Sequence, residues 1–126
     1  MMNGEGRFSV VVGERAEAVL VSVGGQMAAK LYASFEELEI DPRSHELGGR
    51  SWWNAKAVGA LHKRGYPFYR VSAYEIKPLR VLYFIDEPRR RVLICDIVEK
   101  DDNTYEPGAE HIRAIIRDFL EYRNLG

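Results

Sequence analysis

The sequence contains one cysteine, Cys95, so no disulfide can form within the chain. The histidines, His45, His62 and His111, are scattered without the spacing of metal ligands, and there is no glycine-rich phosphate loop or Ser-His-Asp arrangement. No apolar run approaches the roughly 20 residues that a membrane-spanning helix requires. The first residues also lack the apolar stretch of a signal peptide. These absences argue against a secreted disulfide scaffold, a zinc domain and a membrane protein, and we expect a cytoplasmic protein.

Length and composition favour one folded unit. At 126 residues, of which 46% are hydrophobic, the chain can build one core but is too short for two. We therefore expect a single domain spanning residues 1–126. Cys95 lies in an apolar stretch, and its expected role is that of a small buried hydrophobic side chain.

The net charge of −1 hides an uneven distribution of charge. Residues 50–91 contain ten Lys or Arg against three Asp or Glu, whereas 1–49 and 92–126 each contain four against eight. A basic segment between acidic ones is expected of a protein that binds a polyanion or an acidic partner. The alternative is that these side chains serve solubility alone.

Apolar periodicity predicts the outer elements. Phe8 to Val12 is a short β-branched run, and Glu14 to Val23 can form a helix that ends at a glycine pair. Apolar residues then recur at helical spacing from Met27 to Leu38, which predicts a second helix and a helical hairpin. Gly108 to Arg123 has one apolar stripe and predicts an amphipathic C-terminal helix that covers the sheet.

The segment from His45 to Gly65 is ambiguous. Asn54 to Leu61 could form a short helix or the entrance to a strand. Trp52 and Trp53 are adjacent, so in a regular element they cannot both face the core. An outward tryptophan could stack on a base, or it could simply lie on the surface.

Tyr66 to Tyr105 predicts an antiparallel meander, because its apolar runs are short, β-branched and aromatic and are separated by turn residues. The expected register places Arg70 near Phe84 and Arg80 opposite Asp96. Even-numbered side chains should then share one face, apolar at one end and polar at the other. Arg80 could serve there as a phosphate ligand, as the partner of a costly buried Asp96, or as both. With helices segregated from an antiparallel sheet of about four strands, the fold class is α+β.

This meander resembles the sheet of the RelE/ParE toxin superfamily. The resemblance is carried by Tyr69-Arg70, by the run from Leu79 to Tyr83, by the apolar strand from Val92 to Val98 and by Tyr105 at its end. It covers roughly residues 8–12 and 26–105. It implies a RelE-like fold with an N-terminal strand and helical hairpin, followed by the meander and a C-terminal helix.

The resemblance also implies a toxin of a type II toxin-antitoxin system that cleaves mRNA, can associate with the ribosome and is held inactive by an antitoxin protein. It implies catalysis by arginine, lysine and tyrosine without a metal or other cofactor, and it assigns phosphate contact to Arg80 and stacking or acid-base chemistry to Tyr105. Arg70 is the third catalytic candidate. The RNA-binding candidates are Lys56, Lys63, Arg64, Lys77 and Lys100.

Two other readings stay open. The ParE branch of the same superfamily is non-catalytic and inhibits DNA gyrase, and an inactive relative would only bind a partner or RNA. The acidic pair Asp101-Asp102 before Tyr105 favours a non-catalytic protein, because it would repel a phosphate at short range. Arg70 and Arg80 within the sheet favour the nuclease.

Overall fold

The computed structural model describes residues 7–43, 45–46, 53–73, 76–99 and 110–125. Four helices and six strands lie in these ranges. In chain order they are β1 (Ser9–Val12), α1 (Glu14–Ser22), α2 (Gly25–Ile40), β2 (His45–Glu46), β3 (Trp53–Ala57), α3 (Gly59–His62), β4 (Phe68–Ala73), β5 (Leu79–Asp86), β6 (Arg91–Glu99) and α4 (Glu110–Leu125). The described elements confirm the α+β class, the helical hairpin, the meander and the C-terminal helix.

The strands form one sheet in the order β1-β6-β5-β4-β3-β2. All neighbouring pairs are antiparallel except β1 and β6, which run parallel. The expectation of about four antiparallel strands was therefore wrong in two respects. It missed β2 and β3, which extend the sheet beyond β4. It also did not foresee that the predicted N-terminal strand, β1, would pair in parallel with β6.

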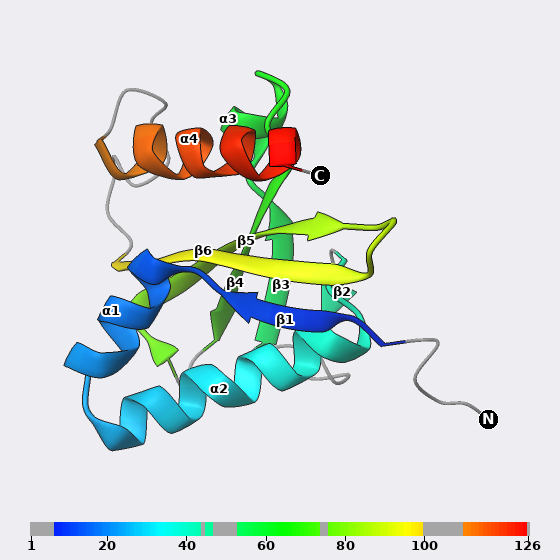
Figure 1. Ribbon diagram of the computed structural model, residues 1–126. Helices are drawn as coiled ribbons and strands as arrows, with labels where there is room; N and C mark the ends of the chain where they lie inside the picture. Colours follow the sequence, from blue (N-terminus) through cyan, green and yellow to red (C-terminus); the bar gives the residue numbers. More distant parts are fainter. Residues whose placement is uncertain (1–6, 44, 47–52, 74–75, 100–109, 126) are drawn as a thin grey trace.

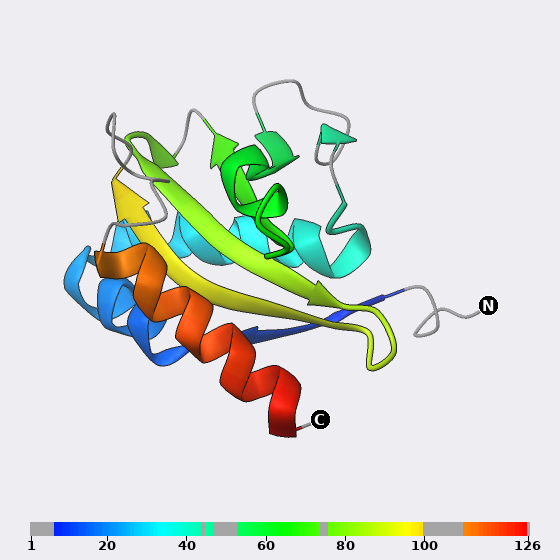
Figure 2. The same cartoon turned by 90° about the horizontal axis from the view of Figure 1, so that it is seen from above.

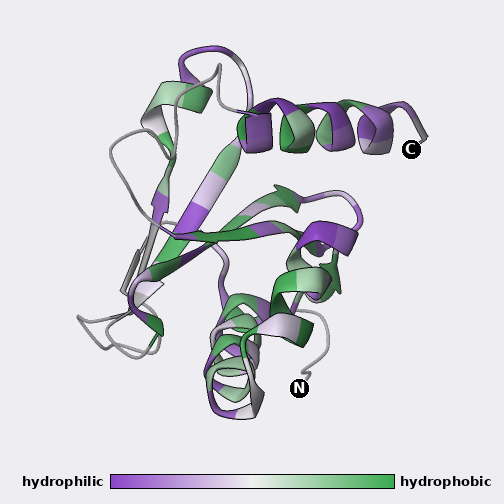
Figure 3. Ribbon diagram, turned by 90° about the vertical axis from the view of Figure 1, so that its left-hand side faces the viewer, coloured by the Kyte–Doolittle hydropathy of each residue, from purple (hydrophilic) through white to green (hydrophobic). Residues whose placement is uncertain are grey.

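Helices cover both faces of the sheet (Figure 1). Helices α1 and α2 lie on one face, and α3 and α4 lie on the other. Figure 2, seen from above, shows α4 at one side of its face and α3 at the other, with β5 and β6 visible between them. In Figure 3 both α2 and α4 alternate hydrophilic and hydrophobic residues along the ribbon, as expected for helices with one buried side.

Two hydrophobic cores, one on each face of the sheet, fill the space between these layers. The expectation of one core was therefore wrong, because a sheet covered by helices on both faces buries apolar side chains on each side. The first lies against α1 and α2 and includes Leu31, Phe35, Val81 and Tyr83. The second lies against α3 and α4 and includes the buried side chains of Leu61, Phe68, Leu82, Phe84, Ile112, Ile115 and Phe119. Because side chains alternate along a strand, β5 sends Val81 and Tyr83 to the first core and Leu82 and Phe84 to the second.

Glycines shape the N-terminal hairpin. Gly13 donates its N–H to the carbonyl of Ile94 at 2.8 Å, and a Cβ at Gly13 would lie 3.0 Å from that same oxygen. A side chain there would disturb the passage from β1 into α1. Gly24 has a φ of 87°, a left-handed conformation that glycine adopts readily, and it separates α1 from α2.

The pairing of β4 with β5 confirms that the predicted strands are neighbours but corrects their register. Phe68 pairs with Phe84 and Arg70 with Leu82, whereas the expectation placed Arg70 near Phe84. The shift is two residues, so the same side chains still share a face.

The β5–β6 register corrects the expectation more strongly. A four-residue turn, 87–90, brings Asp86 opposite Arg91, and a bulge follows between Leu82 and Tyr83. Arg80 therefore pairs with Val98, and Leu82 pairs with Asp96. Between the turn and the bulge, odd-numbered residues of β5 pair with even-numbered residues of β6. Val92 and Ile94 therefore lie in the first core, on the face opposite Leu82 and Phe84. A one-residue change in a hairpin turn has this effect because the side-chain period of a strand is two.

Within the described ranges, no helix is long and apolar enough to cross a membrane.

Candidate nucleic-acid interface

Three adjacent strands each place a cation on the α3/α4 face of the sheet. Arg70 precedes Val71 of the first core, and Arg80 precedes Val81 of that core, so both arginines project to the opposite face. Lys56 on β3 pairs directly with Arg70, so it shares that face. We call Lys56, Arg70 and Arg80 the basic strip.

Strand geometry keeps the basic strip together. Directly opposite residues such as Lys56 and Arg70 have Cβ atoms roughly 5 Å apart, and diagonal neighbours such as Arg70 and Arg80 lie roughly 7–8 Å apart. Like charges directly opposite each other are destabilising. A phosphate anion bound between them would relieve this repulsion, and the spacing allows two of the side chains to contact one phosphate.

The side chains of the basic strip remain accessible. Lys56 is exposed, and Arg70 and Arg80 are partly buried. Arg70 donates a long hydrogen bond of 3.5 Å from Nη1 to the Ser72 hydroxyl. In the part of the chain that the structure describes, Arg80 has no ion pair.

Asp96 is not the partner of Arg80, and this part of the prediction was wrong. The β5–β6 bulge places Asp96 opposite Leu82, where its side chain is 7% exposed. Burial raises the pKa of the Asp96 carboxyl above its ordinary value, while the N–H of Ile97 and the charges of His111 and Arg15 act in the opposite direction. The Ile97 N–H donates to Asp96 Oδ1 at 2.8 Å. The groups that offset the burial of Asp96 thus come from its own strand, α1 and α4.

The other predicted RNA-binding residues are dispersed. Lys63 and Arg64 are exposed in the turn after α3, and Lys77 is exposed in the turn before β5. Neither turn belongs to β3, β4 or β5, the strands that carry the basic strip. Lys100 and Tyr105 fall outside the described residues, and so do the side chains of Trp52 and Trp53.

The contacts of His62 and the burial of Cys95 indicate that both side chains contribute to packing. The His62 ring lies 2.9 Å from the carbonyl oxygen of Phe68 and meets the Tyr69 ring edge-on. Cys95 is buried, and desolvation raises the pKa of its thiol well above the ordinary value. This burial agrees with the expected role of Cys95 as a small hydrophobic side chain. No group of three His, Cys, Asp or Glu residues suited to a metal ion occurs among the described residues.

Sequence reasoning missed two features of this region. One is the pairing of Lys56 with Arg70, which depends on recognising β3. Its sequence, WNAKA, has no β-branched residue, so the strand signal is weak. The other is the proximity of His111 and Arg15 to Asp96, which no local pattern announces because the three residues come from different elements.

Comparison with known proteins identifies the fold. No protein-family model and no curated protein matches the chain. Among solved structures, a chain of the archaeal RelE–RelB complex from Pyrococcus horikoshii OT3 matches with a TM-score of 0.51 and 13% identity, covering 76% of this chain and 98% of that one. The isolated E. coli RelE toxin gives a TM-score of 0.47 at 13% identity, with 90% and 99% covered. The archaeal match supports a RelE-like fold, as the sequence resemblance implied.

Proposed function

We propose that this protein is a RelE-like toxin of a type II toxin-antitoxin system, and that it acts as a metal-independent endoribonuclease on mRNA at the ribosome. The observation that carries the proposal is the basic strip, in which three neighbouring strands of a RelE-like sheet each supply a cation to one face. A fold can host many functions, so the side chains of the site must carry the argument.

The proposed chemistry needs charge stabilisation more than it needs a metal. In cleavage beside a ribose 2′-OH, the 2′ oxygen attacks phosphorus, the 5′ oxygen leaves, and a 2′,3′-cyclic phosphate forms. This path requires a base for the 2′ proton, an acid for the leaving oxygen and cations around the doubly charged phosphorane. Arg80 and Arg70 would supply the cations, because they are held by strands and so need little rearrangement.

Lys56 and Tyr105 are assigned further roles in the proposal. Lys56 would hold a neighbouring phosphate, since it is exposed and lies opposite Arg70. Tyr105 would stack on a base or transfer a proton. The exposed Lys63, Arg64 and Lys77, together with Lys100, would contact RNA outside the reacting phosphate.

A small antitoxin with acidic segments is the proposed protein partner. The structure matched from Pyrococcus horikoshii is a RelE–RelB complex. Complementary charge speeds and specifies association, so an acidic segment that lies over the basic strip would both bind this protein and block RNA. Toxin, antitoxin and mRNA would meet in the cytoplasm.

The proposal is tested by incubating the purified protein with a 5′-labelled mRNA under two conditions: with ribosomes in a magnesium buffer, and without ribosomes in the presence of a metal chelator. We expect cleavage that ends in a 2′,3′-cyclic phosphate and that stops when a 2′-deoxynucleotide replaces the ribose at the cleavage site. An intact mRNA under both conditions would contradict the nuclease. Inhibition of DNA gyrase in a parallel supercoiling assay would instead support the ParE-like alternative.

Two substitutions at one position separate the roles of Tyr105. Tyr105→Phe keeps the ring but removes the hydroxyl, whereas Tyr105→Ala removes both. Cleavage lost in both variants would indicate proton transfer, and cleavage kept in Tyr105→Phe alone would indicate stacking. Unchanged cleavage in both would remove Tyr105 from the mechanism.

A further inference from the structure

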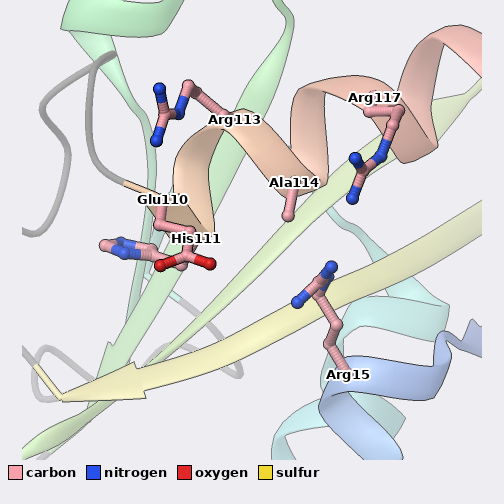
Figure 4. A pocket seen from close by; sticks show the side chains of 6 residues that line it. All are labelled: Arg15, Glu110, His111, Arg113, Ala114 and Arg117. Atoms are coloured by element: carbon pink, nitrogen blue, oxygen red, sulfur yellow. The ribbon is translucent and has the colours of Figure 1, made fainter.

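A basic hollow, separate from the basic strip, lies between α1 and the first half of α4. It has a volume of about 630 Å³ and is lined by Arg15, Glu110, His111, Arg113, Ala114 and Arg117. Figure 4 shows the guanidinium groups of Arg15 and Arg117 pointing toward each other across the opening between the two helices. None of these residues belongs to the basic strip, and none was among the predicted site residues.

The charge of this hollow is only partly compensated. Arg15 is paired with Asp118 at 3.5 Å. Arg113 and Arg117 form no ion pair with any residue in the described ranges. Two cations that approach each other repel, and an anion between them would turn the repulsion into attraction on both sides.

Two further groups shape the potential of the hollow. It opens beside the first turn of α4, a helix of 16 residues whose dipole favours an anion at this end. The Glu110 carboxylate also lines it, and the Asp96 carboxyl lies near His111 and Arg15. The raised pKa of Asp96 reduces its negative charge near the acid end of the pH range.

We propose that this hollow binds a phosphate group, carried either by the backbone of an RNA chain or by a free nucleotide. Guanidinium groups match phosphate oxygens with paired N–H donors. The volume lies within the usual range of small-ligand sites, about 300–1,000 Å³. The phosphate site shares no residue with the basic strip, so binding there does not require that the protein cleave RNA.

The test compares two variants of α4. The double variant Arg113→Gln/Arg117→Gln removes both arginine charges and keeps a polar side chain at each position. Arg123→Gln is the matched control, because it removes one arginine from the same helix at a position over the Phe119 ring, outside the hollow. Thermal melting establishes that each variant is folded, and the single variant Arg117→Gln replaces the double variant if the latter does not fold.

Binding is measured with a short 2′-O-methyl RNA, which cannot be cleaved, across a series of salt concentrations. For single strands the slope of log K against log salt changes by about 0.7 for each phosphate contact. We expect the double variant to lose about 1.4 from this slope if both arginines contact phosphate, while Arg123→Gln keeps the wild-type slope. The same proteins are titrated with adenosine monophosphate and with inorganic phosphate.

A reduced RNA slope supports a phosphate of the RNA backbone, and lost mononucleotide binding with an unchanged RNA slope supports a free nucleotide. The proposal is overturned if the double variant matches Arg123→Gln with all three probes. It is also overturned if binding of a polyglutamate peptide alone depends on Arg113 and Arg117, since the hollow would then receive an acidic protein. A cleavage assay on the same samples keeps this result separate from the proposed nuclease activity.

Discussion

The two faces of the sheet differ in what they carry. Beneath α1 and α2, strands β4, β5 and β6 present apolar side chains that meet Leu31, Phe35 and Leu38 of α2. Beneath α3 and α4, the sheet is apolar around Phe68, Leu82 and Phe84, but the basic strip lies next to these residues. The first face therefore serves stability, whereas the second divides its area between a core and a charged surface.

The largest expected loss of stability comes from the first face. Leu31→Ala should lower the free energy of unfolding by about 2–5 kcal/mol, because Leu31 is 0% exposed and its truncation leaves a cavity. Ile40→Ala on the same helix is the control, since Ile40 is 54% exposed and should change the free energy by less than about 0.5 kcal/mol. Urea denaturation measures both. Equal effects would show that α2 does not close a core as described.

A smaller effect is expected from a buried hydroxyl on the same face. Tyr83 is 0% exposed, and its hydroxyl donates to the carbonyl of Pro42 at 2.6 Å. Tyr83→Phe leaves that carbonyl without its donor and should cost about 1–2 kcal/mol. Tyr69→Phe is the control on the neighbouring strand, where the ring stacks on Tyr83. If both variants unfold at the same urea concentration as wild type, the Tyr83 hydrogen bond contributes nothing to stability.

Two carboxyls on the second face should respond to pH in opposite directions. Burial raises the pKa of Asp96. Burial also acts to raise the pKa of Asp86, but hydrogen bonds from Tyr122 and Arg89 outweigh it and lower that pKa. A raised pKa means that the folded protein binds the proton more tightly, so the Asp96 carboxyl costs stability as pH rises above the ordinary value of 3.8. The lowered pKa of Asp86 stabilises the fold above 3.8, and this contribution is lost as pH falls through the folded pKa.

Melting curves of Asp96→Asn and Asp86→Asn between acid and neutral pH check these signs. Relative to wild type, Asp96→Asn should gain stability as pH rises, and Asp86→Asn should lose it. Both differences should shrink in acid, where the wild-type carboxyls are protonated. Parallel curves for the two variants would contradict the assigned surroundings of the carboxyls.

The sequence predicts elements with strong periodicity better than it predicts their register. The stripe from Ile112 to Leu120 identified α4, and the β-branched runs identified β4, β5 and β6. The bulge beside Asp96 and the length of the 87–90 turn change which residues face each other without changing the apolar pattern much. For this reason the neighbours of Arg80 were predicted wrongly although its strand was right.

The arrangement of the basic strip was predictable in part, because it depends on the period of a strand and not on the exact register. Arg70 and Arg80 were recognised as sheet residues, and their shared face survives a two-residue shift because the period of a strand is two. The hollow around Arg113 and Arg117 could not be predicted, because it depends on where α1 and α4, which cover opposite faces of the sheet, come close to each other. Long-range docking of this kind leaves no signal within a short window of sequence.

The division of the second face is tested most directly at Arg80. Arg91 is a suitable control, because it is exposed on the same face of the sheet. It begins β6, whereas Arg80 pairs with Val98 near the other end of that strand. Thermal melting and mRNA cleavage should be measured on the same samples of Arg80→Ala, Arg91→Ala and wild type. We predict that Arg80→Ala changes the free energy of unfolding by less than about 0.5 kcal/mol and lowers cleavage by about 10²–10³-fold, while Arg91→Ala leaves both unchanged. A destabilised Arg80→Ala, or one that cleaves mRNA as wild type does, would contradict the account.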